Sequence, residues 1–347
     1  MKREAIYIGD TPVKAGERAT VDLPIARLYT HTEMKLPVQV IHGRKEGPVL
    51  FVSAAIHGDE INGVEIIRRL LRLKLLNNIR GSLIAIPIVN VYGFINRSRY
   101  LPDRRDLNRS FPGNYSGSLA SLLARLFMDE IVAKCTHGID LHSGSNHRAN
   151  LSQIRATLDN PEIERMANSF GAPVIINARL RDSSLRAAVV GSGIPMLLYE
   201  GGESLRFNER PITVGMNGIV AVMREIGMLP RKTRKKPRQS VVVKATSWVR
   251  ANKSGIVHKA VPLGSVVKKN QRMAGIIDPI GDQEEEVRAP FEGIVIGILN
   301  LPLVHRGDAL FHLASVERPQ DLAEISSMVL DESLSDAEIM GGLTSEE

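Results

Sequence analysis

The fold is decided by residues 49–76, which read VLFVSAAIHGDEINGVEIIRRLLRLKLL. The first seven of these residues, Val49–Ala55, are apolar or small and follow a Gly-Pro pair, which is typical of a buried strand. Apolar residues at helical spacing then run over Ile61–Leu76, with the basic residues mostly on the other face. A second buried strand, LIAIPIV, is predicted over Leu83–Val89. A strand, a helix and a further strand in this order are typical of an α/β unit.

The same alternation continues to about residue 226. We predict helices over Ser118–Cys135, Pro161–Phe170, Ser184–Val190 and Pro211–Ile226, and strands over Gly138–Leu141, Pro173–Ile176 and Pro195–Tyr199. Residues 1–45 are expected to form short strands with turns. This pattern predicts an α/β domain with a largely parallel sheet.

The composition changes after residue 230. Residues 231–238, RKTRKKPR, hold six Lys or Arg in eight positions. A patch for nucleic acid or another anionic surface is one interpretation, but a solvated linker over 231–240 is favoured because the segment separates two kinds of sequence. Residues 317–347 form an acidic tail. The net charge is +7 and the residues from 317 onward carry −8, so residues 1–316 carry +15, which favours anionic partners, small carboxylates included.

Residues 241–316 predict an all-β module, because Val, Ile and Gly are frequent and turn signals recur every eight to twelve residues. Ser254–Ile276 and Glu292–Ala314 form a weak internal repeat. This module resembles the biotinyl/lipoyl barrel-sandwich fold, which attaches its cofactor to a lysine in the hairpin between the halves. The corresponding hairpin, Ile277–Asp282, has no lysine, so a structural or gating module is expected rather than a carrier.

Composition excludes several classes of protein. Of the 347 residues, 43% are hydrophobic, so a sizeable core is expected, and aromatic residues at 4% argue against a stacking platform for single-stranded nucleic acid. Cys135 is the single cysteine, which excludes an internal disulfide and a cysteine-cluster metal site. No apolar run reaches the roughly 18 residues that span a bilayer, and the first residues do not form a signal peptide. A cytoplasmic protein without membrane or nucleic-acid partners is expected.

The hypothesis of a metal site rests on two histidines and a glutamate. His57-Gly58-Asp59-Glu60 lies where a buried strand turns into a helix, and His142 ends a later apolar strand. Carboxyl ends of parallel strands meet at one sheet edge. Two imidazoles, one carboxylate and an open position are typical of a hydrolytic zinc. Asp140 shares a strand face with His142. It could orient a ligating imidazole or a substrate group, or it could serve as a capping or salt-bridge carboxylate, and both interpretations stay open.

A zinc-activated water also needs a proton acceptor. Glu200 follows the strand Pro195–Tyr199 and precedes two glycines, which would let the backbone turn away sharply and leave the carboxylate at the same sheet edge. Glu203 is a rival candidate, although a role at a helix start is favoured for it.

Arginines are concentrated in residues 94–113, in a loop that no core would require. Guanidinium groups bind carboxylates in bidentate fashion and stabilise oxyanions. A solvated basic loop is the alternative, and it is disfavoured because Asn108-Arg109 lies between the apolar Leu107 and Phe111.

The order and the spacings of the candidate site residues are characteristic: His57-x-x-Glu60, Arg99, Asp106-Leu107-Asn108-Arg109, His142 and Glu200. In both respects the sequence resembles the succinylglutamate desuccinylase/aspartoacylase family, a branch of the zinc carboxypeptidase-like fold. The resemblance covers about residues 45–230, and the β module is a usual companion. It implies an α/β fold with a mixed sheet flanked by helices, in a zinc-dependent catalytic domain over 1–230, plus a smaller all-β C-terminal domain over 241–316.

The resemblance also implies residue roles. His57, Glu60 and His142 would ligate one Zn²⁺ per chain, and Glu200 would act as general base and then acid. Arg99 would polarise the scissile carbonyl, with Arg97 and Arg105 as competitors for that role. Asn108 and Arg109 would bind the α-carboxylate of the substrate. The resemblance does not decide which residue would bind a second carboxylate of the substrate. The candidates are Arg155, Arg179, Arg181 and Arg186.

These roles predict a zinc-dependent amidohydrolase that cleaves the amide bond of an N-acyl amino acid or a similar small carboxylate-bearing amide. The alternative is a metallocarboxypeptidase acting on acidic or modified peptide ends, since the same zinc and arginines serve both reactions. A binding protein with a relict site, or nucleic-acid binding through residues 231–238, would be a different class of function. A homo-oligomer is compatible with the sequence.

Overall fold

The computed structural model describes residues 3–231, 240–243, 245–258, 260–281, 284–316 and 319–334. Except for Arg231, the basic segment 231–238 lies outside the described residues. Of the acidic tail, the structure describes 319–334, and α7 (Pro319–Leu334) covers this range.

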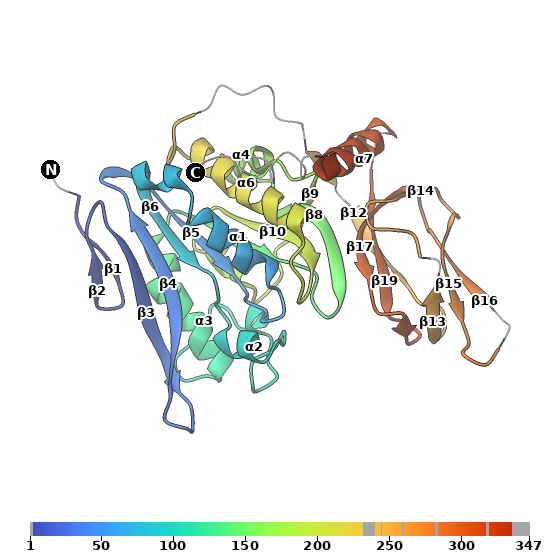
Figure 1. The fold of residues 1–347 in the computed structure, drawn as a ribbon, viewed down its shortest axis with the longest axis horizontal. Coiled ribbons are helices and arrows are strands. Elements are labelled where there is room, and N and C mark those ends of the chain that lie inside the picture. The colour runs from blue at the N-terminus through green and yellow to red at the C-terminus, as the bar shows by residue number, and fades with distance from the viewer. Residues whose placement is uncertain are drawn as a thin grey trace, which may run out of the picture.

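The centre of the fold is a parallel sheet that continues in both directions with antiparallel strands (Figure 1). Four parallel neighbours occupy the centre: β6 (Arg80–Ile86), β5 (Lys45–Ala54), β7 (His137–His142) and β10 (Met196–Glu203). The antiparallel pair β4 (Glu33–His42) and β3 (Arg18–Arg27) continues the sheet beside β6. A separate small hairpin joins β1 (Ile6–Ile8) and β2 (Thr11–Val13).

On the opposite side, β8 (Arg148–Ala156) pairs antiparallel with β10 and parallel with β9 (Val174–Asn177). The expectation of a largely parallel sheet is therefore correct at the centre and for the β8–β9 pair, and wrong for β3, β4 and the pairing of β8 with β10. The sequence of β8, RANLSQIRA, has no apolar run, and its Arg148, Asn150 and Arg155 line the cavity described below. Residues 18–42 form two ten-residue strands where short strands were expected.

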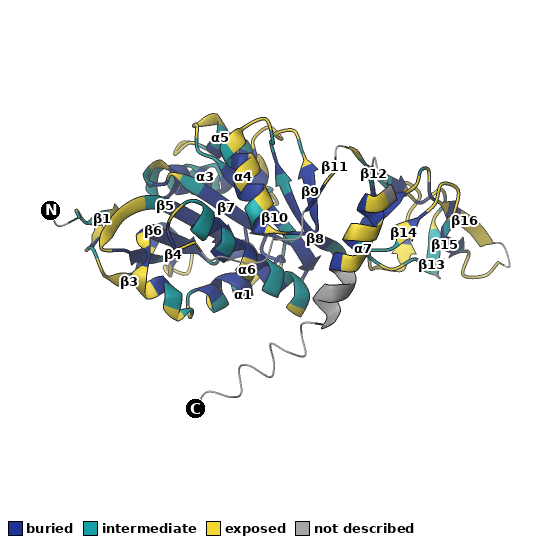
Figure 2. Cartoon of the chain, turned by 90° about the horizontal axis from the view of Figure 1, so that it is seen from above, coloured by how far each residue is buried: buried dark blue, intermediate teal, exposed yellow. Residues whose placement is uncertain are grey.

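Helices cover both faces of the sheet (Figure 1). One face packs on α1 (Asn62–Leu70), α4 (Pro161–Phe170) and α6 (Glu209–Glu225). The other packs on α2 (Val91–Ile95), α3 (Leu119–Glu130) and α5 (Leu185–Gly191). Alternating residues of β5 divide between the two cores, and Figure 2 shows the buried sheet between partly exposed helices. The fold is therefore a mixed sheet flanked by helices.

Helix ends follow the capping residues. α4 has the predicted bounds, since Asn160 accepts hydrogen bonds from two N–H groups of its first turn and Gly171 ends it in the left-handed region at φ +78°. The prediction of one helix over 61–76 is wrong. α1 ends at Leu70, Leu73 is extended, and a 3₁₀ turn, η1 (Lys74–Asn78), follows. The leucines after residue 70 pack on the core without continuing the helix.

The C-terminal strands continue the main sheet. Beyond β8 come β17 (Gly293–Leu299), β19 (Ala309–Ser315) and β12 (Ala245–Arg250), with β14 (Val266–Val267) beside β17. β11 (Val241–Val243) pairs with β9. A separate four-stranded sheet contains β13 (Gly255–His258), β15 (Arg272–Ile277), β16 (Glu284–Arg288) and β18 (Leu303–Val304). The all-β prediction holds up to Ser315. No helix in the described part of the chain is long and apolar enough to cross a membrane.

Candidate metal centre and active site

The candidate site lies at the carboxyl ends of the central parallel strands. His57 and Glu60 belong to the loop between β5 and α1, and His142 is the last residue of β7. Glu200 lies on β10 directly opposite His142 in the parallel register, so the two side chains share one face of the sheet. Strand order thus brings together residues that are far apart in the sequence.

Gly58 lets the loop that carries His57 and Glu60 reach its position. A Cβ at residue 58 would lie 1.9 Å from the carbonyl carbon of Gly93 in α2. The two backbones therefore touch at this point, and only glycine permits the approach.

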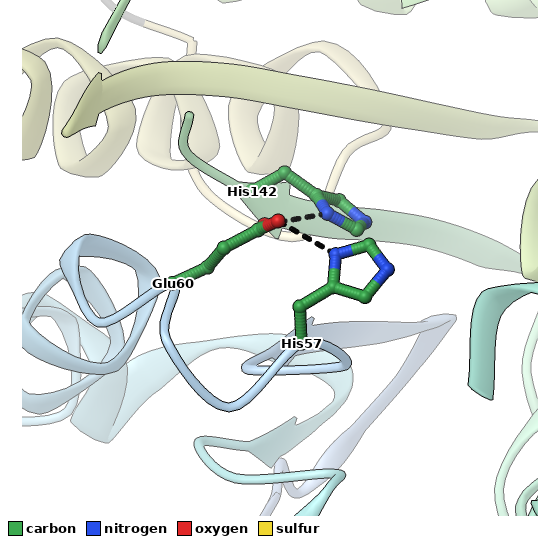
Figure 3. A group of neighbouring side chains, drawn as sticks. All are labelled: His57, Glu60 and His142. Atoms are coloured by element: carbon green, nitrogen blue, oxygen red, sulfur yellow. Dashed lines mark hydrogen bonds and ion pairs between the residues drawn. The ribbon is translucent and has the colours of Figure 1, made fainter. Parts of the chain in front are cut away.

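The two imidazoles converge on one carboxylate (Figure 3). The Nδ1 atom of His57 lies 2.6 Å from Oε1 of Glu60, and the Nδ1 atom of His142 lies 2.7 Å from Oε2. All three side chains are buried, and their potential ligand atoms lie within 4.8 Å of one another. Two imidazole nitrogens and a carboxylate at this separation are a donor set that fits a divalent transition metal.

The outer nitrogens of both rings are held by further carboxylates. The Nε2 atom of His142 lies 2.7 Å from Asp140, which also accepts a hydrogen bond from Ser53 Oγ at 2.7 Å. The Nε2 atom of His57 lies 3.1 Å from Asp106. Such contacts fix the ring orientation and direct Nδ1 toward the ligand position. Asp140 therefore has the geometry of a carboxylate that orients an imidazole, one of the roles left open for it.

Electrostatics favour positive charge at the centre of this cluster. Burial alone would raise the pKa of the Glu60 carboxyl, but the imidazoles of His57 and His142 more than offset burial and lower it. Burial likewise opposes the charged form of both imidazoles, yet the adjoining carboxylates raise the pKa of each. A divalent cation, or protons on the imidazoles, can supply the positive charge that the carboxylates require.

Glu200 faces the same space from β10. Its Oε2 atom accepts a hydrogen bond from Asn150 Nδ2 at 2.8 Å, and its Oε1 atom lies 3.8 Å from Arg155 Nε. Burial raises the pKa of this carboxyl, although Arg155 and His142 oppose the rise. A carboxylate with a raised pKa is suited to accepting and returning a proton.

The predicted sharp turn after Glu200 is wrong. β10 continues to Glu203, and the two glycines form a bulge in its pairing with β8, with Gly202 at φ +88°. A Cβ at residue 202 would meet Asn62 at 2.6 Å, so the bulge sits against the start of α1. The rival Glu203 lies 3.6 Å from Arg206 and does not line the cavity that contains Glu200.

Arg99 reaches the metal cluster from the loop after α2. Its Nη2 and Nε atoms donate to Asp106 at 2.9 and 3.3 Å, and its Nη1 atom lies 3.5 Å from Glu60 Oε1. The competing Arg97 and Arg105 do not line the cavity, and Arg105 pairs with Asp103. Arg99 is thus the arginine of this loop that adjoins the His57–Glu60 pair.

Asn108 and Arg109 form another part of the cavity wall. Asn108 Oδ1 accepts the backbone N–H of Leu185 at 2.9 Å, which leaves the Asn108 amide NH₂ for a ligand. Arg109 donates to the carbonyl of Asn108, and burial lowers the pKa of its guanidinium. This pair can bind a carboxylate.

These residues line one cavity of about 1080 Å³, which also contains all four arginines considered for a second carboxylate. Arg186 is buried and donates to the carbonyls of Ala178 and Arg179 at 3.1 and 2.8 Å, so it supports the loop. The Arg179 side chain is exposed on that loop, and Arg155 lies beside Glu200.

Several residues in or beside the cavity could not be assigned from the sequence. Asp106 was part of the quoted motif but had no role, although it contacts both His57 and Arg99. Asn150 lies on the strand that lacked an apolar run and carried no signal. Trp248 and His312 come from the β module, and only the pairing of β12, β19 and β17 with β8 brings them to the site.

Known proteins share this architecture. Residues 46–226 match the family model for the succinylglutamate desuccinylase/aspartoacylase catalytic domain. The N-alpha-acetyl-L-2,4-diaminobutyric acid deacetylase of Halomonas elongata is 26% identical over 295 residues, which cover 81% of this chain and 86% of that protein.

Solved structures agree at the level of the fold. A succinylglutamate desuccinylase/aspartoacylase from Rhodobacter sphaeroides superposes with a TM-score of 0.77 at 23% identity, covering 86% of this chain and 95% of that one. The product-bound ectoine utilization protein EutE (DoeB) from Ruegeria pomeroyi gives 0.78 at 22% identity, with the same coverage. The family model spans more than half of the chain, and the protein therefore belongs to the succinylglutamate desuccinylase/aspartoacylase family, whose members hydrolyse carbon–nitrogen amide bonds.

Proposed function

We propose that the protein is a zinc-dependent amidohydrolase that cleaves an N-acyl amino acid into a carboxylate and a free amine. The observation that supports this most strongly is the convergence of the His57–Glu60–His142 cluster, Glu200 and Arg99 on one cavity with Asn108 and Arg109 in its wall. His57, Glu60 and His142 would hold one Zn²⁺ per chain. A bound Zn²⁺ supplies Lewis acidity, which lowers the pKa of water and polarises a carbonyl.

Glu200 moves the proton. It accepts a proton from the attacking water and delivers it to the amine nitrogen as the amide bond breaks. Its raised pKa keeps the protonated form accessible for the second step. Asn150 keeps the carboxylate in position through its hydrogen bond at 2.8 Å.

Arg99 stabilises the oxyanion that develops on the scissile carbonyl. Asp106 fixes the guanidinium through two hydrogen bonds, so little reorganisation is needed when charge develops. Asn108 and Arg109 bind the α-carboxylate and so set the position of the amide.

The substrate assignment draws on the Halomonas elongata relative, a deacetylase of an N-acetyl amino acid. The cavity is lined by eight arginines and three carboxylates, which favours a substrate of negative charge. We assign the chemistry to residues 1–230 and the outer cavity wall to 241–316, with 231–240 as linker and 317–347 as tail.

Hydrolysis of a defined panel tests the proposal. The purified chain would be loaded with Zn²⁺, its metal content measured, and released amines detected after incubation with N-acetyl and N-succinyl amino acids and short acidic peptides. We expect one Zn²⁺ per chain and turnover of acyl amino acids. Turnover of peptides alone would establish the carboxypeptidase alternative, and a zinc-loaded protein that releases no amine would contradict enzymatic function.

A further inference from the structure

Asn150 on β8 lies between two strands that both place a glycine opposite it. Its partner on β10 is Gly202, and its partner on β17 is Gly297. Asn150 donates a hydrogen bond from Nδ2 to Glu200 Oε2 at 2.8 Å, so the position of its carboxamide bears directly on the proposed proton carrier. Because β17 belongs to the β module, Gly297 is the point at which that module meets the hydrogen-bond partner of Glu200.

The backbone conformation does not require glycine at residue 297. Gly297 lies inside the strand β17 and its φ is not in the left-handed region. The bulge between Val295 and Gly297 in the pairing with β19 contains no residue with a positive φ, so it does not demand glycine either. Glycine weakens the interior of a strand, and it often marks a site where another group approaches closely. We therefore looked for the reason in the space around this residue.

The two side chains next to Gly297 leave no room for a Cβ. A Cβ at residue 297 would lie 3.1 Å from Asn150 Oδ1 and 3.1 Å from the Cβ of His312. Both distances are shorter than an ordinary van der Waals contact, so at least one neighbour would have to move. An alanine at this position would therefore act on Asn150, on His312 or on both.

Of these two neighbours, His312 has the smaller freedom to move. The crowded atom of His312 is its Cβ, which the backbone of β19 holds in place, and its buried ring stacks on Trp248 at 4.5 Å with 6° between the ring planes. Asn150 is half-buried, and its crowded atom is the oxygen at the end of the side chain, which moves when the side chain rotates. A Cβ at residue 297 would thus displace the Asn150 carboxamide and weaken its hydrogen bond to Glu200.

Gly297 does not itself line the active-site cavity, whereas Asn150 and His312 do. The missing side chain at residue 297 therefore gives no additional room to a ligand. Any effect of this residue on the reaction has to pass through a neighbour, and Asn150 connects it to Glu200. This geometry is that of a positioning residue, which acts on the reaction without touching the substrate.

We propose that the β module positions the proton carrier, because Gly297 keeps open the space in which the Asn150 carboxamide is oriented toward Glu200. This inference rests on the proposed function for the role of Glu200 in proton transfer. The coupling of Gly297 to Asn150 rests on the geometry alone. The module thereby takes part in catalysis in a way that is separate from forming the outer cavity wall.

A double-mutant cycle on the zinc-loaded protein tests this coupling. Gly297→Ala should lower kcat by about 5- to 50-fold, as for a weakened hydrogen bond to a charged group, and should change KM by less than about twofold. Asn150→Ala should lower kcat to a similar extent. In the Asn150→Ala background the oxygen that a Cβ at residue 297 would meet is gone, so the added Gly297→Ala should change kcat by less than about twofold.

Gly191→Ala is the matched control. Gly191 is an exposed residue at the end of α5, where a Cβ would meet nothing within 4 Å, so this variant should keep the wild-type kcat. A wild-type kcat in Gly297→Ala, or a loss by the same factor in both backgrounds, would overturn the proposal. Circular dichroism would establish that each variant is folded. If Gly297→Ala alone did not fold, a folded double variant would support the crowding of Asn150, and an unfolded double variant would contradict it.

The Asn150 side chain can also be observed without turnover, by nuclear magnetic resonance of zinc-free protein that contains isotope-labelled asparagine. The NH₂ signals of Asn150 are those that Asn150→Ala lacks. They should shift in Gly297→Ala and in Glu200→Gln, and should coincide with the wild-type signals in Gly191→Ala. Such shifts in a protein that releases no amine would retain the positioning contact and refute the proposed function. Amine release together with unshifted Asn150 signals in Gly297→Ala would overturn the inference and leave the proposed function intact.

Discussion

At Glu200 a single carboxylate has to accept a proton and then return it. Glu200→Gln keeps the size of the side chain but cannot accept the proton, so we expect kcat to fall by about 10²- to 10⁴-fold. Zinc content should stay at the wild-type level, because Glu200 is not among the three residues grouped as candidate ligands. Glu203→Gln, on the same strand but outside the cavity, is the matched control. Wild-type turnover by Glu200→Gln would remove this residue from the mechanism.

The hydrogen bond from Asn150 contributes to the pKa of Glu200. Glu200 must be ionised to accept a proton, so kcat/KM should fall as the pH drops through its pKa, which burial raises. Asn150 stabilises the ionised form and thereby lowers this pKa. Asn150→Ala should therefore move the acidic limb of the pH profile to higher pH. An acidic limb that stays in place, or that moves to lower pH, would show that another group controls it.

Substitution of Asp140 tests whether this carboxylate orients the His142 ring. Asp140→Asn removes the charge that lies 2.7 Å from His142 Nε2, and changes of this kind typically weaken metal affinity about 10- to 100-fold. Competition with a zinc chelator would measure the difference. Asp129→Asn, which alters a pair with Arg125 on α3, should leave zinc affinity unchanged and serves as control. Equal affinities of Asp140→Asn and wild type would contradict the orienting role.

The cluster of His57, Glu60 and His142 could be predicted from the sequence because each residue lies at or just after the end of a strand that the sequence predicts. Strand ends in a parallel sheet meet at one edge, whatever the details of the loops. Asn150 could not be predicted, because its strand shows no apolar run and its partner Glu200 lies 50 residues away. The pairing register between strands that are distant along the chain leaves no local sequence pattern, whereas the periodicity of a helix or a strand does.

At the scale of elements, Glu65 holds Arg69, the residue that connects α1 to α6. It accepts hydrogen bonds from Arg68 at 2.6 Å and from Arg69 at 2.7 Å, and Arg69 also pairs with Glu209 on α6. The hydrogen bonds from Arg68, with those from Arg69, lower the pKa of Glu65 to about 2. A carboxylate with a lowered pKa stabilises the fold above its unfolded pKa, and this contribution is lost as the pH falls.

Glu65→Gln should therefore lower the free energy of unfolding at pH 7 by about 1 kcal/mol, since the arginine partners are partly solvated. The difference from wild type should shrink as the pH falls from about 4.5 toward 2, the pKa range set by the unfolded and folded states. Urea unfolding of both proteins at several pH values would measure it. A difference that persists undiminished at low pH would show that packing rather than charge is responsible.

The ends of helices and strands could be predicted where a capping residue marks them, and could not be predicted elsewhere. Asn160 and Gly171 delimit α4 at the predicted positions. The leucine-rich stretch after Leu70 has a helical pattern but turns into a 3₁₀ segment, because burial of these leucines can be achieved without a continuous helix. The glycines after Glu200 indicated a change of direction, and the structure uses them for a bulge within a continuous strand.

At the scale of the whole molecule, the main sheet contains strands from both sides of the change in composition near residue 230. β17 pairs with β8, and β11 pairs with β9. Apolar residues of β8 and β9 share a buried core with residues of β11, β17 and α7. The amino-acid composition therefore divides the chain into two parts, while the main sheet runs through both.

A chain ending at residue 230 should consequently fail as an independent unit. It would lose β17 and β11, expose the apolar core side of β8 and β9, and leave their edges open to pairing with other molecules. We expect this truncated chain to aggregate on expression, and to unfold without a sharp thermal transition if refolded. Light scattering and circular dichroism would measure both properties beside the full chain. A soluble monomer of residues 1–230 with native-like cooperativity would show instead that the catalytic part folds alone, and that strand pairing across the boundary serves the shape of the cavity rather than the stability of the fold.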